Sequence, residues 1–282
     1  MPLHAGTPGQ WEVAGDGQKP SPVFFGPGPG WGIKPLQTPR DPNHAMQLLA
    51  GTSGFSYKEW LGKFYPEKLP AAEMLRYYAG QFATVEINNT FYRMPAETML
   101  ARWAEEVPAD FAFTLKAPRR ITHELRLKEC EAHVAEFLRR AQALGGKLGP
   151  VLFQLPPFLK KDLPRLRDFL ALLPAGRPAA FEFRNDSWQD DEVYETLRAE
   201  GAMLCYTDTE QGESPPLVAT TDCGYLRLRR THYEDTDLGD WAGRIAALPL
   251  ARAYVYFMHE DDALGTVFAR KLLDLWKQEA GT

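Results

Sequence analysis

Eight short apolar runs, separated by longer amphipathic stretches, constrain the fold of this 282-residue chain more than any other feature. The runs are rich in β-branched and aromatic residues, which favour strands. The stretches between them repeat apolar residues at helical spacing, and strands that alternate with helices predict a parallel sheet. The eight runs are QLLAGTSG, ATVEINNT, FAFTLKAP, PVLFQLPP, AAFEFRND, MLCYTDT, YLRLRR and AYVYFMHE.

The stretches between the runs predict helices and suggest a closed sheet. Eight strands with crossover helices are the number that forms a (β/α)₈ barrel, or TIM barrel, and the length beyond residue 46 suits that barrel. An open doubly wound α/β sheet is the alternative, but the first strand–helix turn lacks the GxGxxG fingerprint of that fold. The Pro-rich gap 210–224 predicts a short helix or none. The expected helices lie near 70–81, 97–106, 124–144, 162–173, 189–200, 238–248 and 264–278.

The first 45 residues differ from the rest of the chain. The protein has 23 glycines and 23 prolines, and 17 of these fall within residues 1–45, where no hydrophobic period is visible. A segment of this composition cannot bury a core, so we expect a poorly ordered extension. The barrel is predicted to be a single domain spanning residues 46–282.

Charge and cysteine content narrow the classes of function. The net charge of -5 lacks the strongly basic footprint of a dedicated nucleic-acid binder. The three cysteines form no CxxC pair, which argues against a zinc ribbon or a disulfide framework and fits a reducing compartment. No apolar run is long enough to span a membrane, and no signal peptide is visible. We therefore expect a cytoplasmic protein with no membrane partner.

Polar residues gather where the predicted strands end. Glu86 and Asn88 close the second strand and Lys116 closes the third. In (β/α)₈ enzymes the loops that follow the strands carry the active site. We therefore predict a site at this mouth of the barrel. Its candidate members are Glu86, Asn88, Tyr92, Arg93, Lys116, His123, Gln154, Glu182, Arg184, Trp188, Asp208, Arg227 and Arg229.

The two-residue period of a strand assigns these side chains to one face. In the second strand Glu86 stands between Val85 and Ile87, so its side chain points to the opposite face from theirs. In the fifth strand Glu182 stands between Phe181 and Phe183 in the same way. A barrel buries both faces of its strands, the outer face under helices. We expect the apolar sets to face the helices and the polar sets to face the barrel interior and mouth.

These residues also allow a purely structural interpretation. Glu86 and Glu182 could form ion pairs with Lys116 and Arg184 inside the barrel, without any catalytic role. Gln154 could be a hydrogen-bonded core residue. Aromatic residues are more often core than ligand platform, although a tryptophan directly after the fifth strand, such as Trp188, is a candidate for a pocket wall.

Seven motifs, taken in order, resemble the signatures of the YecE-like family, a family of unknown function. The resemblance covers roughly residues 47–278 and implies a TIM-barrel-like fold, but it implies no reaction. The chain departs from many members at Arg229, where they carry His, and at Met258–His259, where they carry Asn. The motifs are GTSGFSYKEWLGKFYP, VEINNTFYRMP, FTLKAPRRITH, KLGPVLFQLPP, FEFRNDSW, YLRLRRTHYEDTDLGDWAGRI and YFMHEDDALG.

The family's motif positions add a few residues to the candidate site. The resemblance carries over onto Glu86, Asn88, Thr90, Tyr92, Arg93, Lys116, Thr122, His123, Gln154, Pro156, Glu182, Arg184, Ser187, Trp188, Asp208 and Arg227.

An enzyme acting on a small anionic or sugar-like substrate is the first functional hypothesis. Glu86 or Glu182 would be the general acid/base, assisted by Lys116 or His123. The remaining candidates would bind substrate, because arginine grips a carboxylate or phosphate with two hydrogen bonds. No cofactor is expected.

Two other classes of function remain open. One is metal-assisted hydrolysis or isomerisation, with a divalent ion held by Glu86, Glu182, Asp208 and His259. The cations nearby would compete for those carboxylates. The other is a non-catalytic barrel that binds a nucleic acid or a protein, which the acidic charge balance disfavours.

Overall fold

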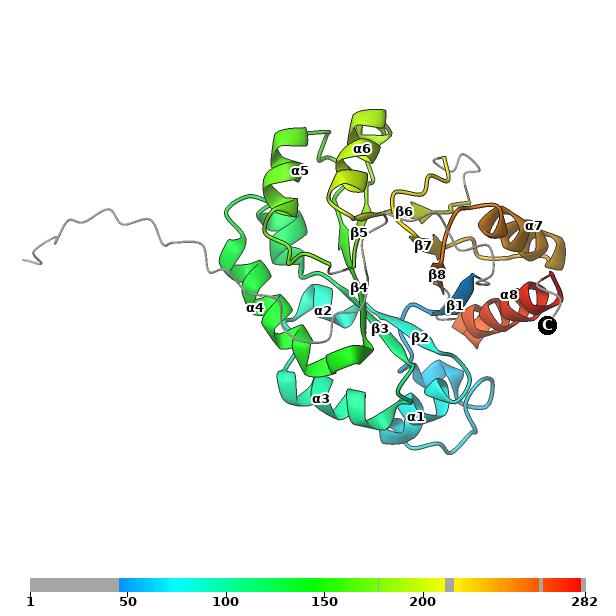
Figure 1. The fold of residues 1–282 in the computed structure, drawn as a ribbon. Coiled ribbons are helices and arrows are strands. Elements are labelled where there is room, and N and C mark those ends of the chain that lie inside the picture. Colours follow the sequence, from blue (N-terminus) through cyan, green and yellow to red (C-terminus); the bar gives the residue numbers. More distant parts are fainter. Residues whose placement is uncertain (1–45, 177, 211–215, 259–260, 280–282) are drawn as a thin grey trace, which may run out of the picture.

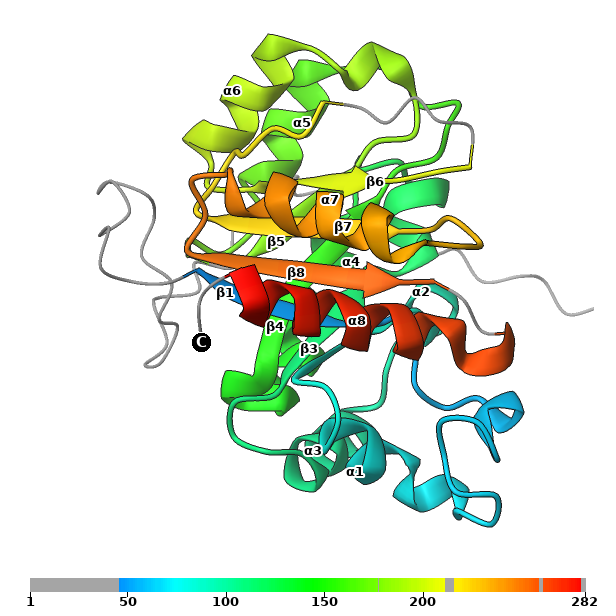
Figure 2. The same cartoon turned by 90° about the vertical axis from the view of Figure 1, so that its right-hand side faces the viewer.

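The computed structural model describes residues 46–176, 178–210, 216–258 and 261–279, which form a barrel of eight parallel strands wrapped by helices. Neighbouring strands follow the order β1-β8-β7-β6-β5-β4-β3-β2. Figure 1 shows the helices outside the strands, and Figure 2 shows β6, β7 and β8 running in one direction with α7 and α8 packed over them. The (β/α)₈ prediction is confirmed.

All eight predicted strands form. They are β1 (Gln47–Thr52), β2 (Thr84–Ile87), β3 (Ala112–Lys116), β4 (Leu148–Gln154), β5 (Ala179–Glu182), β6 (Met203–Thr207), β7 (Cys223–Leu228) and β8 (Arg252–Phe257). The α-helices are α1 (Met74–Ala79), α2 (Asn89–Tyr92), α3 (Glu97–Glu106), α4 (Glu131–Ala141), α5 (Leu163–Leu170), α6 (Asp191–Ala199), α7 (Asp235–Ala246) and α8 (Leu264–Glu279).

Two segments differ from the prediction. The helix expected near 124–144 begins only at Glu131, because a π-helical turn occupies Arg120–Glu124 and Arg126, Leu127 and Glu129 take positive φ angles that no α-helix can continue. The short helix α2 follows β2 directly and was not predicted. Residues 216–222 contain no helix, as expected, and residues 211–215 of that gap lie outside the described part.

The two faces of the strands build two separate cores. Val85, Ile87 and Phe181 join the outer core between strands and helices, as the two-residue period predicts. The inward side chains fill the barrel as a second cluster, so its lower part is a packed core and not a pore. That cluster consists of Leu49, Leu152, Ala180, Met203, Cys205, Cys223, Tyr225, Tyr254 and Tyr256.

The seam between β1 and β2 closes the barrel without a regular ladder. A single bridge links Ser53 to Glu86, and the hydroxyl of Tyr78 from α1 inserts beside it. This hydroxyl accepts a hydrogen bond from the Thr52 N–H (2.9 Å) and donates one to the Thr84 carbonyl (3.1 Å). A Cβ at Gly51 would lie 2.2 Å from the Thr84 oxygen, so the approach of the two strands requires glycine there.

Residues 1–45 lie outside the described part of the chain, so the expected extension stays a prediction. Among the helices of the described ranges, none is long and apolar enough to cross a membrane.

Candidate functional site

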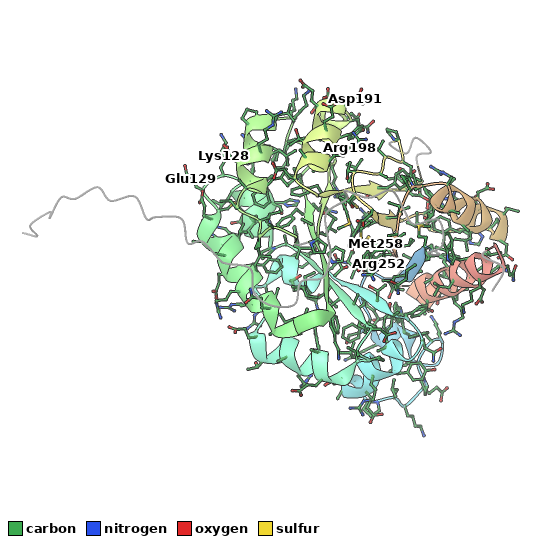
Figure 3. All side chains as sticks on the ribbon, viewed as in Figure 1. Lys128, Glu129, Asp191, Arg198, Arg252 and Met258 are labelled. Atoms are coloured by element: carbon green, nitrogen blue, oxygen red, sulfur yellow. The ribbon has the colours of Figure 1, made fainter. Side chains whose placement is uncertain are left out.

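A buried cluster of two carboxylates and one guanidinium group lies at the C-terminal ends of the strands. Arg227 of β7 reaches across the barrel and contacts Glu86 of β2 and Glu182 of β5. Its Nη2 lies 2.9 Å from Glu86 Oε1, and its Nη1 lies 2.6 Å from Glu182 Oε2. All three side chains are almost fully buried. Arg227 also donates to the Met258 Sδ at 3.2 Å, and Figure 3 shows Met258 over the centre of the barrel.

Further donors complete the shell around both carboxylates. Glu86 accepts hydrogen bonds from Ser53 Oγ (2.7 Å) and from the hydroxyl of Tyr225 (2.6 Å). Glu182 accepts hydrogen bonds from Gln154 Nε2 (2.7 Å) and from Arg184 Nε (3.0 Å). Arg229 Nη1 lies 3.8 Å from Glu182 Oε1. Every oxygen of the two carboxylates therefore has at least one donor.

The charges of this cluster are fixed by their neighbours. Burial opposes ionisation of Glu182, but Arg227 and Arg184 outweigh it and lower its pKa to about 2. Burial also acts against Glu86, whose pKa is nevertheless lowered by Arg227 and by the hydrogen bonds from Tyr225 and Ser53. Both groups are ionised at neutral pH, which suits them to hold cations in place.

The cluster carries an excess of positive charge toward solvent. Two carboxylates face the three guanidinium groups of Arg227, Arg184 and Arg229, which leaves a net charge of about +1 before Lys116 is counted. Arg227 is fully buried, whereas the side chains of Arg184 and Arg229 are 34% and 29% exposed. The two outer arginines are therefore the cations that an incoming ligand meets.

Lys116 is the least compensated charge at this mouth. It ends β3 and is 9% exposed, and within the described residues its Nζ makes no hydrogen bond or ion pair. The Nζ lies 4.1 Å from the ring centroid of Phe91. Burial, together with the charge of Arg227, lowers the pKa of Lys116 to about 8. About a tenth of this amine is therefore neutral at pH 7, far more than for an ordinary lysine.

His123 joins the same group through Phe91. Its ring meets the Phe91 ring edge to face at 4.9 Å, and its Nδ1 is 2.9 Å from Thr122 Oγ1. Burial, followed by the charge of Lys116, lowers the pKa of His123, so the ring is neutral at pH 7. The residue lies in the π-helical turn after β3, a type of distortion that is frequent at functional sites.

The turn after β2 aligns this part of the mouth. Thr90 Oγ1 donates to the Lys116 carbonyl (2.6 Å), which ties α2 to the end of β3. Asn88, the residue before α2, has a buried Oδ1 without a hydrogen-bond partner in the described part of the chain. An unsatisfied buried acceptor is costly unless something donates to it.

Trp188 and Asp208, two of the predicted site residues, lie away from this cluster, and two others are exposed to solvent. Tyr92 is 79% exposed, with its ring edge to face on Phe91 at 5.0 Å, and Arg93 is also exposed. Trp188 is buried in the outer core, stacked on Phe183 with ring centroids 4.5 Å apart, and its indole N–H donates to the Leu159 carbonyl. The structure thus places Trp188 behind the barrel wall and not at the mouth, because its short helix folds back onto the outer face of β5.

Asp208 belongs to a separate polar group. The hydroxyl of Tyr233 donates to its Oδ2 at 2.9 Å, and burial raises the pKa of Asp208. Of the metal ligand set considered from the sequence, Asp208 bonds to Tyr233 and not to Glu86 or Glu182, and His259 lies outside the described part of the chain. Among the described residues, no group of three or more His, Cys, Asp or Glu is placed to hold a metal ion.

Comparison with known proteins assigns the family. A family model described as protein of unknown function DUF72 matches residues 49–282. This chain belongs to the DUF72 family. The match covers all eight barrel strands except the first two residues of β1.

Two bacterial relatives are named UPF0759 proteins. The chain is 40% identical to the UPF0759 protein YecE of Escherichia coli K12 over 101 residues, which cover 36% of this chain and 37% of YecE. It is 29% identical to the UPF0759 protein YunF of Bacillus subtilis 168 over 174 residues, covering 56% of this chain and 61% of YunF. The alignments thus span about a third and three fifths of those relatives.

Solved DUF72 structures share the fold. A DUF72 family protein of Thermotoga maritima matches 84% of this chain and 100% of its own, with a TM-score of 0.70 and 27% identity. A DUF72 family protein of Enterococcus faecalis matches 84% of this chain and 96% of its own, with a TM-score of 0.68 and 20% identity. These likenesses support the barrel and carry no information about the reaction.

Three contributors to this candidate site were missed in the sequence. Tyr225 shares the inward face of β7 with Arg227, so its spacing of two residues was an available signal. Ser53 directly follows β1, at a strand end like the other site residues, but it was not among the predicted site residues. Phe91 is one of the aromatic residues that are more often core than ligand platform, and nothing in its spacing indicates that Lys116 and His123 pack on its ring.

Two surface clefts lie elsewhere on the barrel. A cleft of about 290 Å³ between the start of α4 and α5 is lined by residues such as Leu127 and Arg165. A cleft of about 510 Å³ between the α1 region and α8 is lined by residues such as Phe64 and Arg270. Neither contains a residue of the Glu86–Glu182–Arg227 cluster.

Proposed function

We propose that the barrel mouth is the active site of an enzyme that binds a small anionic substrate and transfers a proton through Lys116. The observation that carries this proposal is the state of the Lys116 amine. It is buried and without a described hydrogen-bond or ion-pair partner, whereas Glu86, Glu182 and Arg227 are compensated by one another. A lysine held in this state has an amine with a pKa near the working pH, as general base catalysis requires.

An anionic substrate follows from the charges around this amine. Arg184 and Arg229 are partly exposed and exceed the negative charge available to them. Arginine binds carboxylate and phosphate groups with parallel hydrogen bonds. Such a ligand would neutralise the excess, and an uncharged sugar would not.

The two buried carboxylates have a supporting role in this proposal. Glu86 and Glu182 are ionised at neutral pH and engaged by several donors, so neither has a proton to give as a general acid. They hold Arg227 and orient the outer arginines. Their general acid/base role, expected from the sequence, is weaker on this geometry than that of Lys116.

Selective labelling of the amine tests the proton-transfer group. Trinitrobenzenesulfonate, an anionic reagent that modifies neutral amines, should label Lys116 before the exposed lysines, with a half-maximal rate near pH 8. Ordinary lysines titrate near pH 10.4. Inorganic phosphate should protect Lys116 but not Lys128, which lies on the periphery in Figure 3. Labelling of Lys116 no faster than Lys128 would overturn the proposal.

Ligand-dependent stabilisation tests the anion site. Phosphate or pyruvate should raise the Tm in a concentration-dependent way, because a ligand bound only by the folded state stabilises it. The substitutions Arg184→Gln and Arg229→Gln should abolish that rise. Arg198→Gln is the matched control, since Arg198 is exposed on α6, which lies outside the strands of the barrel in Figure 1. Equal stabilisation of all three variants would exclude this mouth as the anion site.

A further inference from the structure

We propose that Lys116 forms a Schiff base with the carbonyl carbon of a small substrate whose carboxylate or phosphate group is held by Arg184 and Arg229. The substrate class is therefore a 2-oxo acid or a phosphorylated ketone or aldehyde. This inference rests on the proposed function, because it needs the same anion site and the same amine. It adds a covalent bond to the role of Lys116.

The geometry holds the amine as a nucleophile would need to be held. Lys116 is the last residue of β3, and its backbone is fixed by the hydrogen bond from Thr90 Oγ1. Its Nζ rests against the face of Phe91, which shields one side from water. A side chain buried to this degree with an uncommitted amine has its lone pair available for a carbon atom.

The surrounding charges keep the amine reactive and also tolerate the product. Burial and the positive charges of Arg227 and Arg184 favour the neutral amine, whereas Glu182 and Glu86 favour the charged form. His123, whose ring packs edge to face on Phe91, is itself held neutral. The two carboxylates can therefore compensate the positive charge of an iminium ion once it forms.

The chemical step balances with a proton and water as the other species. The Lys116 Nζ lone pair attacks the carbonyl carbon and forms a C–N bond, and the C=O π electrons move to oxygen, which takes a proton. Nitrogen loses a proton, and the carbinolamine oxygen takes a second proton and leaves as water, giving the iminium ion. His123 packs on the same Phe91 ring, and its Nε2 makes no hydrogen bond within the described residues, so it can relay protons.

The same arrangement also suits a covalent role. An electrophile that is anchored at its acid group presents its carbonyl carbon at a fixed position, which is what attack by an amine requires. Lys116 ends β3, and β4 lies between β3 and β5, whose last residue Glu182 is 3.0 Å from Arg184 Nε. An anion held by the outer arginines would therefore bring its carbonyl to the same end of the barrel as the amine.

Reductive trapping tests the inference. The full-length protein is incubated with pyruvate and sodium borohydride, and the modified peptide is located by tandem mass spectrometry. Pyruvate should yield a stable secondary amine on Lys116, with saturating dependence on its concentration. Methyl pyruvate, which lacks the negative charge, should modify Lys116 much less. Dihydroxyacetone phosphate tests whether the anion site prefers a phosphate.

Matched variants control for folding and for surface lysines. Lys116→Met and Lys116→Arg should abolish trapping at this position while the variants stay folded, and Lys128→Met should leave trapping unchanged. Modification spread evenly over the exposed lysines, or trapping that survives Arg184→Gln combined with Arg229→Gln, would overturn the Schiff-base proposal.

The result also separates this inference from the proposed function. If phosphate stabilises the protein and Lys116 is labelled preferentially, but neither pyruvate nor dihydroxyacetone phosphate is trapped, the Schiff base is wrong and proton transfer by Lys116 stands. If phosphate neither stabilises the protein nor protects Lys116, both proposals fail.

Discussion

At the scale of single residues, Lys116 occupies a position in the folded protein where burial and a nearby cation disfavour the protonated amine. The amine lies beside the cation Arg227 and on an aromatic ring, with no carboxylate within ion-pair distance in the described part of the chain. Active sites often hold such strained or uncompensated groups at a cost in stability. The folded state therefore binds the Lys116 proton less tightly than the unfolded chain does.

Removing this charge should stabilise the protein. With the pKa of Lys116 at about 8 against about 10.4 in the unfolded chain, the penalty at pH 7 is roughly 3 kcal/mol. The substitution Lys116→Met should raise the free energy of unfolding by up to that amount in urea titrations. Between pH 8 and 10 the Lys116 amine is protonated in the unfolded chain but largely neutral in the folded protein. The free energy of unfolding of the wild type should therefore rise over that window, and its difference from that of Lys116→Met should disappear. A less stable variant at pH 7 would contradict this account.

Removing the cation between the two buried carboxylates should destabilise the protein, in contrast to removing the charge of Lys116. Arg227→Met leaves Glu86 and Glu182 buried without their shared partner, which should cost about 3–5 kcal/mol of unfolding free energy. Arg252→Met is the control, because Arg252 lies at the start of β8, partly exposed and bonded to Gln47. Similar losses in both variants would show that the Arg227 pairs contribute nothing specific.

The same pair predicts a loss of stability in acid. The folded pKa of Glu182 is lowered to about 2, against about 4.3 for an ordinary glutamate. Its contribution is therefore fully present above pH 5 and is lost as the pH falls toward 2, because the unfolded chain takes up the proton first. Chemical denaturation at pH 7, 4 and 3 measures this slope, which should be shallower in Glu182→Gln. An equal slope in both proteins would assign the acid sensitivity to other groups.

The sequence predicts which residues meet at the mouth better than it predicts their roles. Strand ends and the two-residue period brought Glu86, Gln154, Glu182 and Arg227 together correctly. The pairing itself could not be predicted, because Glu86 and Arg227 are 141 residues apart and their contact depends on side-chain reach across the barrel. The Lys116 amine has no hydrogen-bond or ion-pair partner within the described residues, and no local sequence pattern predicts such an absence.

At the scale of elements, the seam between β1 and β2 depends on a side chain where other strand pairs use a backbone ladder. The hydroxyl of Tyr78 satisfies the Thr52 N–H and the Thr84 carbonyl, and it also lies 2.9 Å from Thr52 Oγ1. Nothing in the sequence of α1 distinguishes Tyr78 from the adjacent Tyr77, because both occupy a helix that packs aromatic residues against the barrel.

Tyr78→Phe should weaken this seam. Removing the hydroxyl leaves a buried N–H and a buried carbonyl without their partner, which should cost about 1–3 kcal/mol in the free energy of unfolding. Tyr194→Phe is the matched control, since Tyr194 is buried on α6 and its hydroxyl makes no hydrogen bond in the described ranges. Amide hydrogen exchange should show faster opening in β1 and β2 than in β4. A neutral substitution would mean that water replaces the hydroxyl at no cost.

The loop after β3 shows where helix prediction fails. Apolar spacing predicts a helix that begins near residue 124. The chain instead forms a π-helical turn over Arg120–Glu124, and three residues then adopt positive φ angles before α4 begins. Arginine, leucine and glutamate rarely adopt positive φ, so local preference gives no signal for this path. The turn carries His123 to Phe91, which makes the departure from a regular helix part of the site.

At the scale of the whole molecule, the barrel was the most predictable feature. Eight runs with strong β preference and helical spacing between them specify the topology through local patterns that agree with one another. Closure also follows from the strand count. The order of the strands around the barrel is sequential, so no long-range rearrangement had to be inferred.

Deletion of residues 1–45 should leave this barrel intact. The strands run from Gln47 to Phe257, and the outer core begins at Met46, so the described fold is complete without the segment. A loss of 1 kcal/mol would lower the Tm of a domain this size by about 2–4 °C, and the deletion should stay within that range. Thermal unfolding followed by circular dichroism, and phosphate-dependent stabilisation, measure both folding and the site.

A slightly longer deletion provides the contrast. Removing residues 1–52 takes away β1, which pairs with β8 along six residues and carries Gly51 and Thr52 of the seam. The remaining chain would expose the edges of β8 and β2, and we expect it to aggregate or to lose cooperative unfolding. If the shorter deletion behaves like the longer one, residues 1–45 pack on the barrel and contribute to its stability. If it matches the full-length protein in both Tm and phosphate response, the functional unit begins at Met46.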